Sequence, residues 1–227
     1  MELYSYSLSL FSAKVRIALA EKQLHYVLHD VPFDPNRGYV PKHPKVAALN
    51  PKQQVPVLAI GDFALYDSTV IVEYLEDLVP EPALYPREPR AKARCRLLEL
   101  EADEVFFAPI SALIQRRYAR AAGAPEDPDE RPRCAAAFEA HCERLSGQLA
   151  DAEYLCGQFG IADISHVLVA GYGLGLGLSV PPALGNLIAW FARVGARPSV
   201  AREIEAMTKL AHALSLTEPG REAQVSL

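Results

Sequence analysis

The chain has 227 residues, enough for two ordinary domains or one large one, and its composition of 50% hydrophobic and 22% charged residues is globular. A net charge of -5 argues against a nucleic-acid partner, which would need a basic face. No apolar run approaches the ~20 residues of a membrane span, so we expect no membrane partner. The amino terminus, MELYSYSL, has neither the basic region nor the apolar core of a secretory signal, so we expect a cytoplasmic protein.

The first part of the chain alternates between strand and helix patterns. Residues 2–6 and 24–31 have strand character, and a helix is predicted between them from about Phe11 to Lys22. Strand, helix and strand form a βαβ unit, so the two strands are expected to be parallel.

A second strand pair and a second helix come after a proline-broken stretch that can hold only short helical turns. Gly61-Asp62 joins residues 56–60 to residues 63–66 as a hairpin, so this pair is expected to be antiparallel. Residues 68–78, STVIVEYLEDL, then form a helix. Its predicted core face consists of Val70, Ile71, Tyr74, Leu75 and Leu78.

The order βαβ-ββα is that of an α/β thioredoxin-like domain with a mixed four-stranded sheet, which we assign to residues 1–80. The proline-rich residues 81–89 are interpreted as a linker, and residues 90–227 are predicted to be an all-α helical bundle. The first helix of this bundle is expected at about 90–120, with an irregularity at Pro109. The second begins at about residue 133 and has Phe138, Cys142, Leu145 and Leu149 in its core stripe. Further helices are expected at 161–172, 183–195 and 199–215.

The four cysteines follow no metal-binding or redox pattern. Cys95, Cys134, Cys142 and Cys156 are far apart and show no CxxC or Cys/His ligand spacing. We therefore expect neither a disulfide framework nor a metal site, and interpret these residues as small buried hydrophobes with unused thiols.

Pro56 stands at the start of a predicted strand, where a thioredoxin-like domain normally carries a cis proline. The cis bend would leave the backbone N–H and C=O of Val55 facing the first helix, ready to pair with an extended peptide. A proline that ends a loop on an edge strand is the alternative interpretation.

Asp67 and Ser68 stand where a strand passes into a helix, and helix capping is the simplest interpretation of both. The same helix terminus offers N–H groups and a partial positive charge to a carboxylate. Ser68 and its neighbouring amides could hold an α-carboxylate while Asp67 takes the adjoining ammonium. Together they would form a clamp for an amino-acid head group.

Ser9 and Ser12 have the spacing at which a redox protein would carry two cysteines. Ser9 would lie just ahead of the first helix, and no local His or Asp could make it a nucleophile. It can instead donate a hydrogen bond to a thiolate that another molecule brings, close to the positive end of the helix. The alternative is that both serines are ordinary loop and N-cap residues.

Three stretches together resemble the cytosolic glutathione transferase (GST) family. YSYSLSLFSAKVRIALAEK, ALNPKQQVPVL and ALYDSTVIVEYLED lie in that family's order and at its separations. YLCGQFGIADISHVLVAGYG resembles the family's helix-capping region, so the resemblance covers nearly the whole chain. It is closest to the serine-type bacterial, theta-like and zeta-like members.

The resemblance implies roles for individual residues. Ser9 would hydrogen-bond the glutathione thiolate, with Tyr6 as the rival hydroxyl, because other classes use a tyrosine near the end of this strand. Val55 would pair its backbone with the cysteinyl unit beside cis-Pro56.

The resemblance also implies how the two ends of glutathione are held. Asp67 and Ser68 would hold the γ-glutamyl group, while Gln54 and Lys42 would serve the glycyl carboxylate. The loop around Lys42 varies in length, so three neighbours compete for its role: Arg37, His43 and Lys45.

Two departures from the family pattern bear on activity and stability. The zeta class has a serine at the place of Leu10 and a cysteine at the place of Phe11, which argues against maleylacetoacetate isomerase activity. Gly160 stands where the family has a Ser or Thr N-cap. Glycine there costs only a few tenths of a kcal/mol and Asp163 is retained, so capping is expected to survive.

The electrophile would lie across a cleft between the two domains. Its expected walls are Leu8, Leu10 and Phe11 on one side and Glu104, Phe107, Ile110, Ser111 and Tyr118 on the other. Such a helical stripe is more often core than pocket. The GxGxG in AGYGLGLGLSVPPALG follows no strand, so a nucleotide is not expected.

The resemblance therefore implies a glutathione transferase that conjugates glutathione, its co-substrate, to a hydrophobic electrophile without a metal or nucleotide. Members are commonly homodimers, so a homodimer is expected. Two alternatives stay open. One is other glutathione-dependent chemistry on the same site (disulfide or peroxide reduction, dehalogenation, isomerisation), and the other is a non-catalytic GST-like binding or regulatory protein.

Overall fold

A computed structural model describes residues 1–34, 38–39, 41–121, 123–125 and 127–214. These residues form two compact units that divide between Ala83 and Leu84, and each is described by itself. Within the described ranges, no helix combines the length and apolar character needed to cross a membrane.

The first unit is built on a mixed four-stranded sheet, as predicted. The strands β1 (Glu2–Ser5), β2 (Val27–Asp30), β3 (Val57–Ile60) and β4 (Phe63–Tyr66) lie in the order β2-β1-β3-β4. The β1–β2 pair is parallel, whereas β3 is antiparallel to both β1 and β4. Gly61 in the β3–β4 turn has a φ of +63°, a conformation that glycine adopts without steric cost. The predicted βαβ unit and hairpin are both confirmed.

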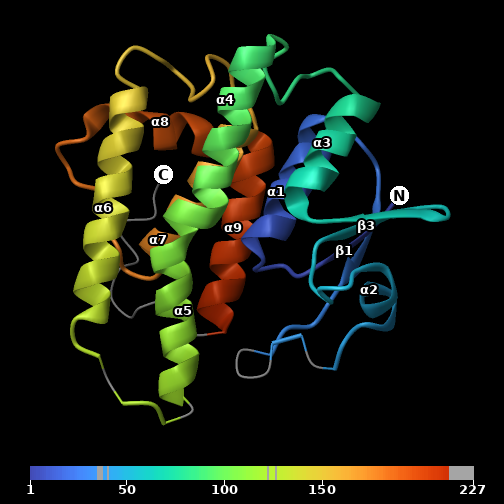
Figure 1. The fold of residues 1–227 in the computed structure, drawn as a ribbon, viewed down its shortest axis with the longest axis horizontal. Coiled ribbons are helices and arrows are strands. Elements are labelled where there is room, and N and C mark those ends of the chain that lie inside the picture. Colours follow the sequence, from blue (N-terminus) through green and yellow to red (C-terminus); the bar gives the residue numbers. More distant parts are fainter. Residues whose placement is uncertain (35–37, 40, 122, 126, 215–227) are drawn as a thin grey trace. The chain divides into compact units, whose positions relative to one another are not determined.

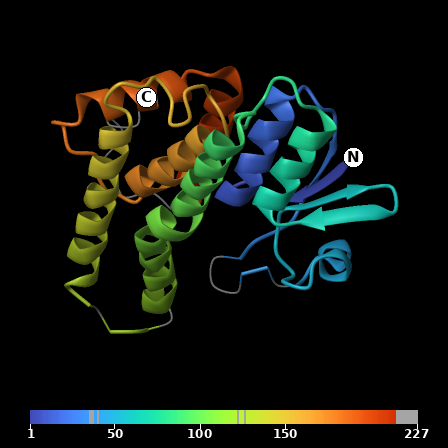
Figure 2. The same cartoon turned by 45° about the horizontal axis from the view of Figure 1, so that its top comes forward.

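Two helices cover one face of this sheet and a short one lies on the other (Figures 1 and 2). α1 (Leu10–Glu21) and α3 (Ser68–Leu78) pack against each other, and α2 (Pro44–Leu49) is the short helix. Lys22 joins the carboxyl ends of α1 and α3, because its buried Nζ lies 2.7 Å from Glu76 Oε2 and donates to the Val79 carbonyl at 2.6 Å. Pairing of this kind is what makes a buried charge tolerable.

The predicted core face of α3 is partly wrong. Ile71 and Leu75 are buried as expected, but Val70 and Leu78 are each 48% exposed. Residues 70, 74 and 78 follow the four-residue spacing of one helix stripe, whereas Ile71, Val72 and Leu75 form the adjacent stripe that packs inward. The apolar surface of α3 is therefore wider than the part that the unit itself buries.

The described residues of the second unit contain helices and no strand, as predicted for residues 90–227. The segments are α4 (Pro89–Leu100), η1 (Glu101–Phe106), α5 (Phe107–Ala121), α6 (Glu130–Gln148), α7 (Ile161–Gly175), α8 (Gly185–Gly195) and α9 (Pro198–Ala213). The end of the predicted 199–215 helix, residue 215, lies outside the described residues.

The predicted irregularity near Pro109 is a π-helical segment. η1 spans Glu101–Phe106, and the N–H of Phe107 donates to the carbonyl of Ala102, five residues earlier. A proline lacks the backbone N–H and crowds the carbonyl four residues before it. The departure from α-helical hydrogen bonding therefore lies in the π-helical turn just before Pro109 and not at Pro109 itself.

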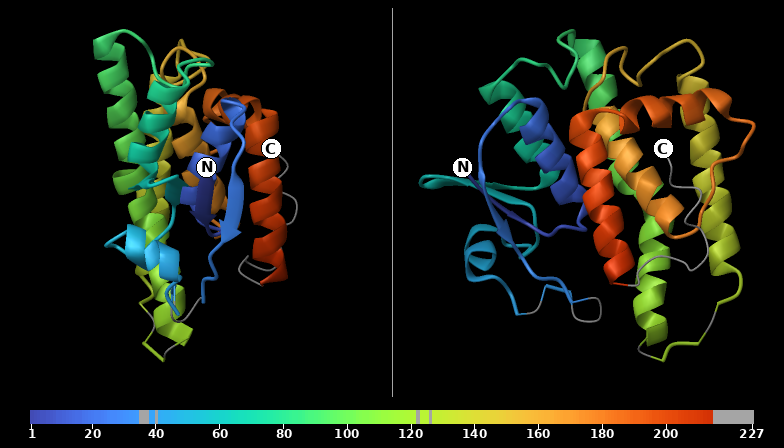
Figure 3. Two further views of the ribbon diagram at one scale, coloured as in Figure 1. Left: turned by 90° about the vertical axis from the view of Figure 1, so that its right-hand side faces the viewer. Right: turned by 180° about the vertical axis from the view of Figure 1, so that it is seen from behind.

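α7 is the central helix of the second unit. It contacts α4, η1, α5, α8 and α9 (Figure 3). Every residue from Ile161 to Ala170 is buried. A helix that is apolar on all sides is expected at such a position. The GxGxG glycines belong to its carboxyl end, where a Cβ on Gly173 would lie 2.5 Å from the ring of Phe138. Phe138, Cys142, Leu145 and Leu149 form the buried stripe predicted for α6.

Gly160 caps α7 as expected, and the structure adds a steric reason for a glycine at this position. It is the N-cap residue of α7, and its N–H donates to Asp163 Oδ2 at 3.0 Å, so half of the capping arrangement is retained. However, a Cβ at this position would lie 2.4 Å from the backbone oxygen of Leu84. The close approach of another chain segment, rather than a small penalty for the cap, explains the glycine.

Candidate functional site

Three predicted site segments leave the sheet at the same end. Tyr4 of β1 is opposite Val57 of β3, which is opposite Tyr66 of β4, so these residues form one row across the sheet. The loop to Ser9 follows β1, Val55-Pro56 directly precedes β3, and Asp67-Ser68 directly follows β4. The register therefore brings these segments to one edge of the first unit.

Ser9 is the N-cap residue of α1 and is half-buried. Its Oγ accepts the N–H of Ser12 at 3.2 Å, which is the capping role given above as the alternative. A hydroxyl that accepts in this way still has its own hydrogen to donate. The same geometry that caps α1 thus leaves a donor at the positive end of the helix.

Arg16 holds the loop that carries Ser9, and the sequence analysis did not identify it. This buried side chain of α1 donates from Nη2 to the carbonyl of Ser7 at 3.1 Å and from Nη1 to the carbonyl of Tyr6 at 3.4 Å. It also contacts Ser5 Oγ through Nη1. A guanidinium with its donors directed at consecutive carbonyls fixes the course of the backbone between β1 and α1.

Tyr6, the rival hydroxyl, packs its ring in an aromatic cluster. The ring is stacked on Phe33 with centroids 5.2 Å apart and meets Tyr39 edge-on at 6.3 Å. It is partly buried and packs against the buried cluster that contains Tyr4, Val31 and Val55. Alternation along β1 directs Tyr4 and Tyr6 to the sheet face opposite to that of Leu3 and Ser5.

The Val55–Pro56 peptide bond is cis, as the sequence analysis expected. Val55 lies just outside the β1–β3 ladder, which begins at Val57, and its side chain is buried. Gln54 is exposed, and its carbonyl accepts from Asn50 Nδ2 at 2.7 Å. Asn50 Oδ1 accepts the N–H of Lys52 at 2.9 Å, so one buried amide shapes the loop that carries Gln54 and Val55.

Asp67 caps α3 from an unusual backbone conformation. Its φ is +77°, a region that residues other than glycine rarely adopt and that is enriched at functional sites. Oδ1 accepts the N–H of Thr69 at 3.1 Å, and Oδ2 lies 3.6 Å from Nζ of Lys52 in an exposed ion pair. Ser68, the first residue of α3, is buried. Capping accounts for Oδ1, whereas Oδ2 pairs with Lys52, whose side chain is exposed.

Lys42 lies in the loop before α2 and is exposed. Two of its three rivals are directed elsewhere: His43 packs its ring 5.2 Å from that of Tyr4, and Lys45 lines a pocket at the other end of the sheet. The third, Arg37, lies outside the described residues.

The residues expected to contact an electrophile differ in exposure. Leu8, Leu10 and Ile110 are buried, Phe11, Phe107 and Ser111 are intermediate, and Glu104 is exposed. The side chain of Tyr118 lies outside the described part of the chain.

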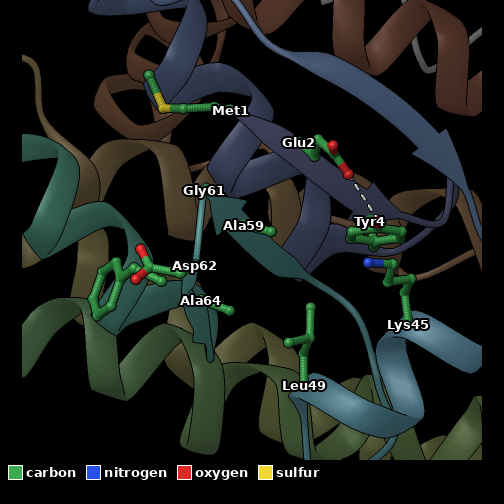
Figure 4. Close-up of a pocket in the computed structure, with 10 residues that line it drawn as sticks. Met1, Glu2, Tyr4, Lys45, Leu49, Ala59, Gly61, Asp62 and Ala64 are labelled. Carbon is green, nitrogen blue, oxygen red and sulfur yellow. Dashed lines mark hydrogen bonds between the residues drawn. The ribbon is translucent and has the colours of Figure 1, made fainter.

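A pocket in the first unit lies at the end of the sheet where β1 begins (Figure 4). Ser9 follows the other end of β1. The pocket is lined by the start of β1, the β3–β4 turn and α2, including Glu2, Tyr4, Lys45 and Asp62. The hydroxyl of Tyr4 donates to Glu2 Oε2 at 2.9 Å, and this bond lowers the pKa of the Glu2 carboxyl. The polar groups of Tyr4 and Glu2 in this pocket are thus hydrogen-bonded to each other. Within the described residues, no group of three or more metal-binding side chains occurs in either unit.

Comparison with known families matches both units. A family model described as "Glutathione S-transferase, N-terminal domain" matches residues 3–83, and one described as "Glutathione S-transferase, C-terminal domain" matches residues 102–198.

Curated relatives carry several different names. The chain is 40% identical to a stringent starvation protein A homolog of Coxiella burnetii over 109 residues, which cover 47% of this chain and 48% of that protein. It is 42% identical to a maleylacetoacetate isomerase of Pseudomonas aeruginosa over 98 residues, 42% of this chain and 45% of that protein. Both matches span less than half the length of those relatives. Glutathione S-transferase 3 of Zea mays is 30% identical over 224 residues, 91% of this chain and 94% of that protein.

The solved structures include a similar protein of nearly the same extent. A glutathione S-transferase from Rhodospirillum rubrum F11 matches with a TM-score of 0.77 and 26% identity, covering 89% of this chain and 90% of that chain.

Proposed function

Because this chain belongs to the glutathione S-transferase family, we propose that it binds glutathione in its first unit and conjugates the glutathione sulfur to an electrophilic small molecule. The reaction would take place in the cytoplasm and would use glutathione as co-substrate, without a metal or nucleotide. The observation that carries this proposal is the row Tyr4, Val57 and Tyr66, which brings Ser9, Val55-Pro56 and Asp67-Ser68 to one end of the sheet.

The central chemical task is to ionise the thiol of glutathione. A thiol with a pKa near 8.5 is only about 3% ionised at pH 7, and lowering that pKa by ~2 units requires about 2.7 kcal/mol of differential stabilisation. A charge-assisted hydrogen bond and a helix amino terminus together reach that order. Ser9 supplies both, since it caps α1 and its hydroxyl hydrogen is available to a thiolate.

The rest of glutathione would be held by backbone and charged groups near the same edge. The backbone of Val55 would pair with the cysteinyl unit, and the amides at Ser68 would receive the γ-glutamyl carboxylate. Asp67 Oδ2 would exchange its exposed contact with Lys52 for the ligand ammonium. Such a surface ion pair is worth at most about 1 kcal/mol, so the exchange is feasible. Gln54 and Lys42, both exposed, would serve the glycyl carboxylate.

Two other functions have specific support. The partial likeness to a maleylacetoacetate isomerase favours glutathione-dependent isomerisation, but Leu10 and Phe11 stand where the zeta class carries a serine and a cysteine. The partial likeness to a stringent starvation protein A homolog favours a regulatory, non-catalytic role. Retention of the hydroxyl, the cis proline and the Asp-Ser pair together supports an enzyme over a binding protein.

Steady-state kinetics with glutathione and a panel of electrophiles, disulfides and peroxides test the proposal. We expect Ser9→Ala to lower kcat about 10- to 100-fold with little change in KM for glutathione, the effect of losing one hydrogen bond to a charged group. Asp67→Asn keeps the cap acceptor and removes the charge, so we expect it to raise KM about 10-fold with little effect on kcat. The absorbance of bound thiolate at neutral pH should disappear in Ser9→Ala.

Two controls separate the hydroxyl from the cap. Ser7→Ala removes an exposed hydroxyl of the same loop and should be silent. Glycine is nearly as good an N-cap as serine, so Ser9→Gly should be as inactive as Ser9→Ala if the hydroxyl is what matters. Full activity in either Ser9 variant, together with loss of activity in Tyr6→Phe, would assign the role to Tyr6. Glutathione binding without any turnover would favour the regulatory role.

A further inference from the structure

Two of the four cysteines lie side by side in the second unit. Cys95 of α4 is buried and Cys156, in the loop between α6 and α7, is half-exposed; both are free thiols, and they are hydrogen-bonded to each other. The sequence places them far apart and gives no reason to pair them. The other two, Cys134 and Cys142, are both buried in α6.

The loop that carries Cys156 is held in place on both sides. The N–H of Leu155 donates to Asp163 Oδ1 at 3.0 Å, and the N–H of Gly157 donates to the carbonyl of Tyr154 at 3.1 Å. Asp163 itself is buried and also accepts from Trp190 Nε1 at 2.8 Å. Hydrogen bonds of the residues on both sides of Cys156 thus fix the backbone of the loop that carries it.

Cys95 is held at the amino terminus of α7. The backbone N–H of Ala162, in the first turn of that helix, is hydrogen-bonded to the Cys95 thiol. The hydrogen bond with Cys156, followed by burial, raises the pKa of the Cys95 thiol, and the nearby carboxyl of Glu99 adds to this. Cys95 is thus the buried member of the pair, while Cys156 is the member that an oxidant in solvent reaches.

We propose that Cys95 and Cys156 form a peroxide-reactive dithiol that closes to a disulfide between α4 and the loop before α7. The sulfur of Cys156 gives up its proton and attacks one oxygen of a hydroperoxide, which breaks the O–O bond, forms a sulfenic acid and releases water or an alcohol. The sulfur of Cys95 then attacks the Cys156 sulfur and displaces its oxygen, which leaves as water with the proton of the Cys95 thiol. Two electrons pass from the two thiols to the hydroperoxide.

The geometry favours closure over further oxidation. Sulfur atoms already in hydrogen-bond contact need only a small approach to reach the disulfide bond length of about 2.05 Å. A resolving thiol beside a sulfenic acid captures it before a second peroxide arrives. This site uses neither Ser9 nor bound glutathione, so the inference stands apart from the proposed transferase activity.

The test treats the purified chain with hydrogen peroxide and measures its intact mass and its reactive thiols. We expect the loss of two hydrogen atoms, a fall in titratable thiols from four to two, and a peptide map that joins Cys95 to Cys156. Dithiothreitol should reverse all three changes. Addition of oxygen atoms without the loss of two hydrogens, a different linked pair, or an unchanged mass would each overturn the proposal.

Matched variants assign the roles of the two thiols. Cys95→Ala should trap the sulfenic acid on Cys156, detected as a dimedone adduct, and Cys156→Ser should abolish both the adduct and the disulfide. Cys134→Ala removes a buried thiol of α6 and should leave disulfide formation unchanged. Persistence of an intramolecular disulfide in Cys95→Ala would contradict the pairing, and the wild-type peptide map decides the matter if a variant fails to fold.

Discussion

His141 and His166 lie inside the second unit in surroundings that oppose their protonation. His141 is stacked on Phe106 at 4.0 Å, the two imidazoles are stacked at 5.4 Å, and Nε2 of each is buried without a hydrogen-bond partner among the described residues. Nδ1 of His141 contacts the guanidinium of Arg144, whose charge acts in the same direction as burial. Burial, as the main cause, lowers the pKa of His141 to about 3 and that of His166 to about 4.

These two histidines predict a loss of stability in mild acid. Above pH 6.5 each is neutral in both the folded and the unfolded chain, so neither contributes. As the pH falls below about 6.5, the unfolded chain takes up two protons that the folded chain refuses until about pH 4 and below. The free energy of unfolding should fall by about 5 kcal/mol between pH 7 and pH 4.5 from these residues alone. Urea denaturation across this range measures the fall.

His141→Phe isolates the effect from the many carboxyl groups that also titrate in acid. Phenylalanine keeps the stacking on Phe106 and removes the titration, so the variant should lose about half of the histidine contribution. His212→Phe, a histidine of the last turn of α9 at the protein surface, is the matched control and should follow the wild-type curve. If the free energy of unfolding fell with pH equally in the wild type and His141→Phe, His141 would not be a source of the acid sensitivity.

The sequence was sufficient to identify site residues that also cap a helix or shape a turn. Ser9 and Asp67 precede helices, and Pro56 precedes a strand, so capping and turn rules locate all three. Arg16 escaped notice because its partners lie 9 to 11 residues earlier in the chain, a separation that has no sequence signature. Asn50 could have been found, since an Asn-Pro pair marks a turn in which the Asn side chain bonds the backbone.

Among the elements, the start of α7 shows how a glycine can be required by its neighbour. The N–H of Ile161 donates to the carbonyl of Leu84 at 3.0 Å, which draws residues 84 and 160 together. The resulting distance of 2.4 Å between a hypothetical Cβ at Gly160 and the Leu84 oxygen leaves no room for a side chain. The φ of -165° at Gly160 is ordinary extended backbone, so space rather than backbone conformation selects glycine.

Gly160→Ser is therefore expected to destabilise the protein, although serine is the better N-cap by a few tenths of a kcal/mol. Forcing a side chain against a backbone carbonyl should lower the free energy of unfolding by about 1–3 kcal/mol. Gly171→Ala in the same helix is the matched control, because nothing lies within 4 Å of its Cβ position, and it should be neutral or stabilising. Equal or higher stability of Gly160→Ser in urea denaturation would show that the backbone at Leu84 moves aside without a measurable energetic cost.

Element boundaries were predictable to within a few residues where apolar periodicity was strong, as in the helix at Ser68–Leu78. The π-helical segment was not, because the effect of Pro109 could be anticipated but the hydrogen bonds that absorb it depend on packing. η1 contacts α7 and α6, and these contacts select where the wider turn occurs. Rules that use only the local sequence take no account of contacts with helices that are distant in the chain.

Across the whole molecule, each unit leaves a group of large apolar side chains in solvent. In the first unit these include Phe63, Tyr66, Val70 and Leu78 on β4 and α3, with exposures of 47%, 37%, 48% and 48%. In the second they include Leu97, Leu100 and Val105 on α4 and η1, with exposures of 59%, 50% and 50%. Large apolar side chains that stay exposed are typical of interaction surfaces, and their exposure on α3 explains why periodicity assigned Val70 and Leu78 to the core. A pattern of apolar residues predicts that they are buried. It does not distinguish burial within the chain from burial against a second chain.

We propose that these surfaces are covered in a homodimer, the assembly expected from the family resemblance. Sedimentation equilibrium should give twice the mass of one chain at micromolar concentration. Val70→Glu places a charge in the apolar stripe of α3 and should raise the dimer dissociation constant at least 10-fold, since burying an unpaired charge is strongly unfavourable. Ile188→Glu changes an exposed apolar residue of α8, 42% exposed, and should leave the dimer intact. A single-chain mass for the wild type would refute the dimer, and a stable Val70→Glu dimer would exclude this stripe of α3 from the interface.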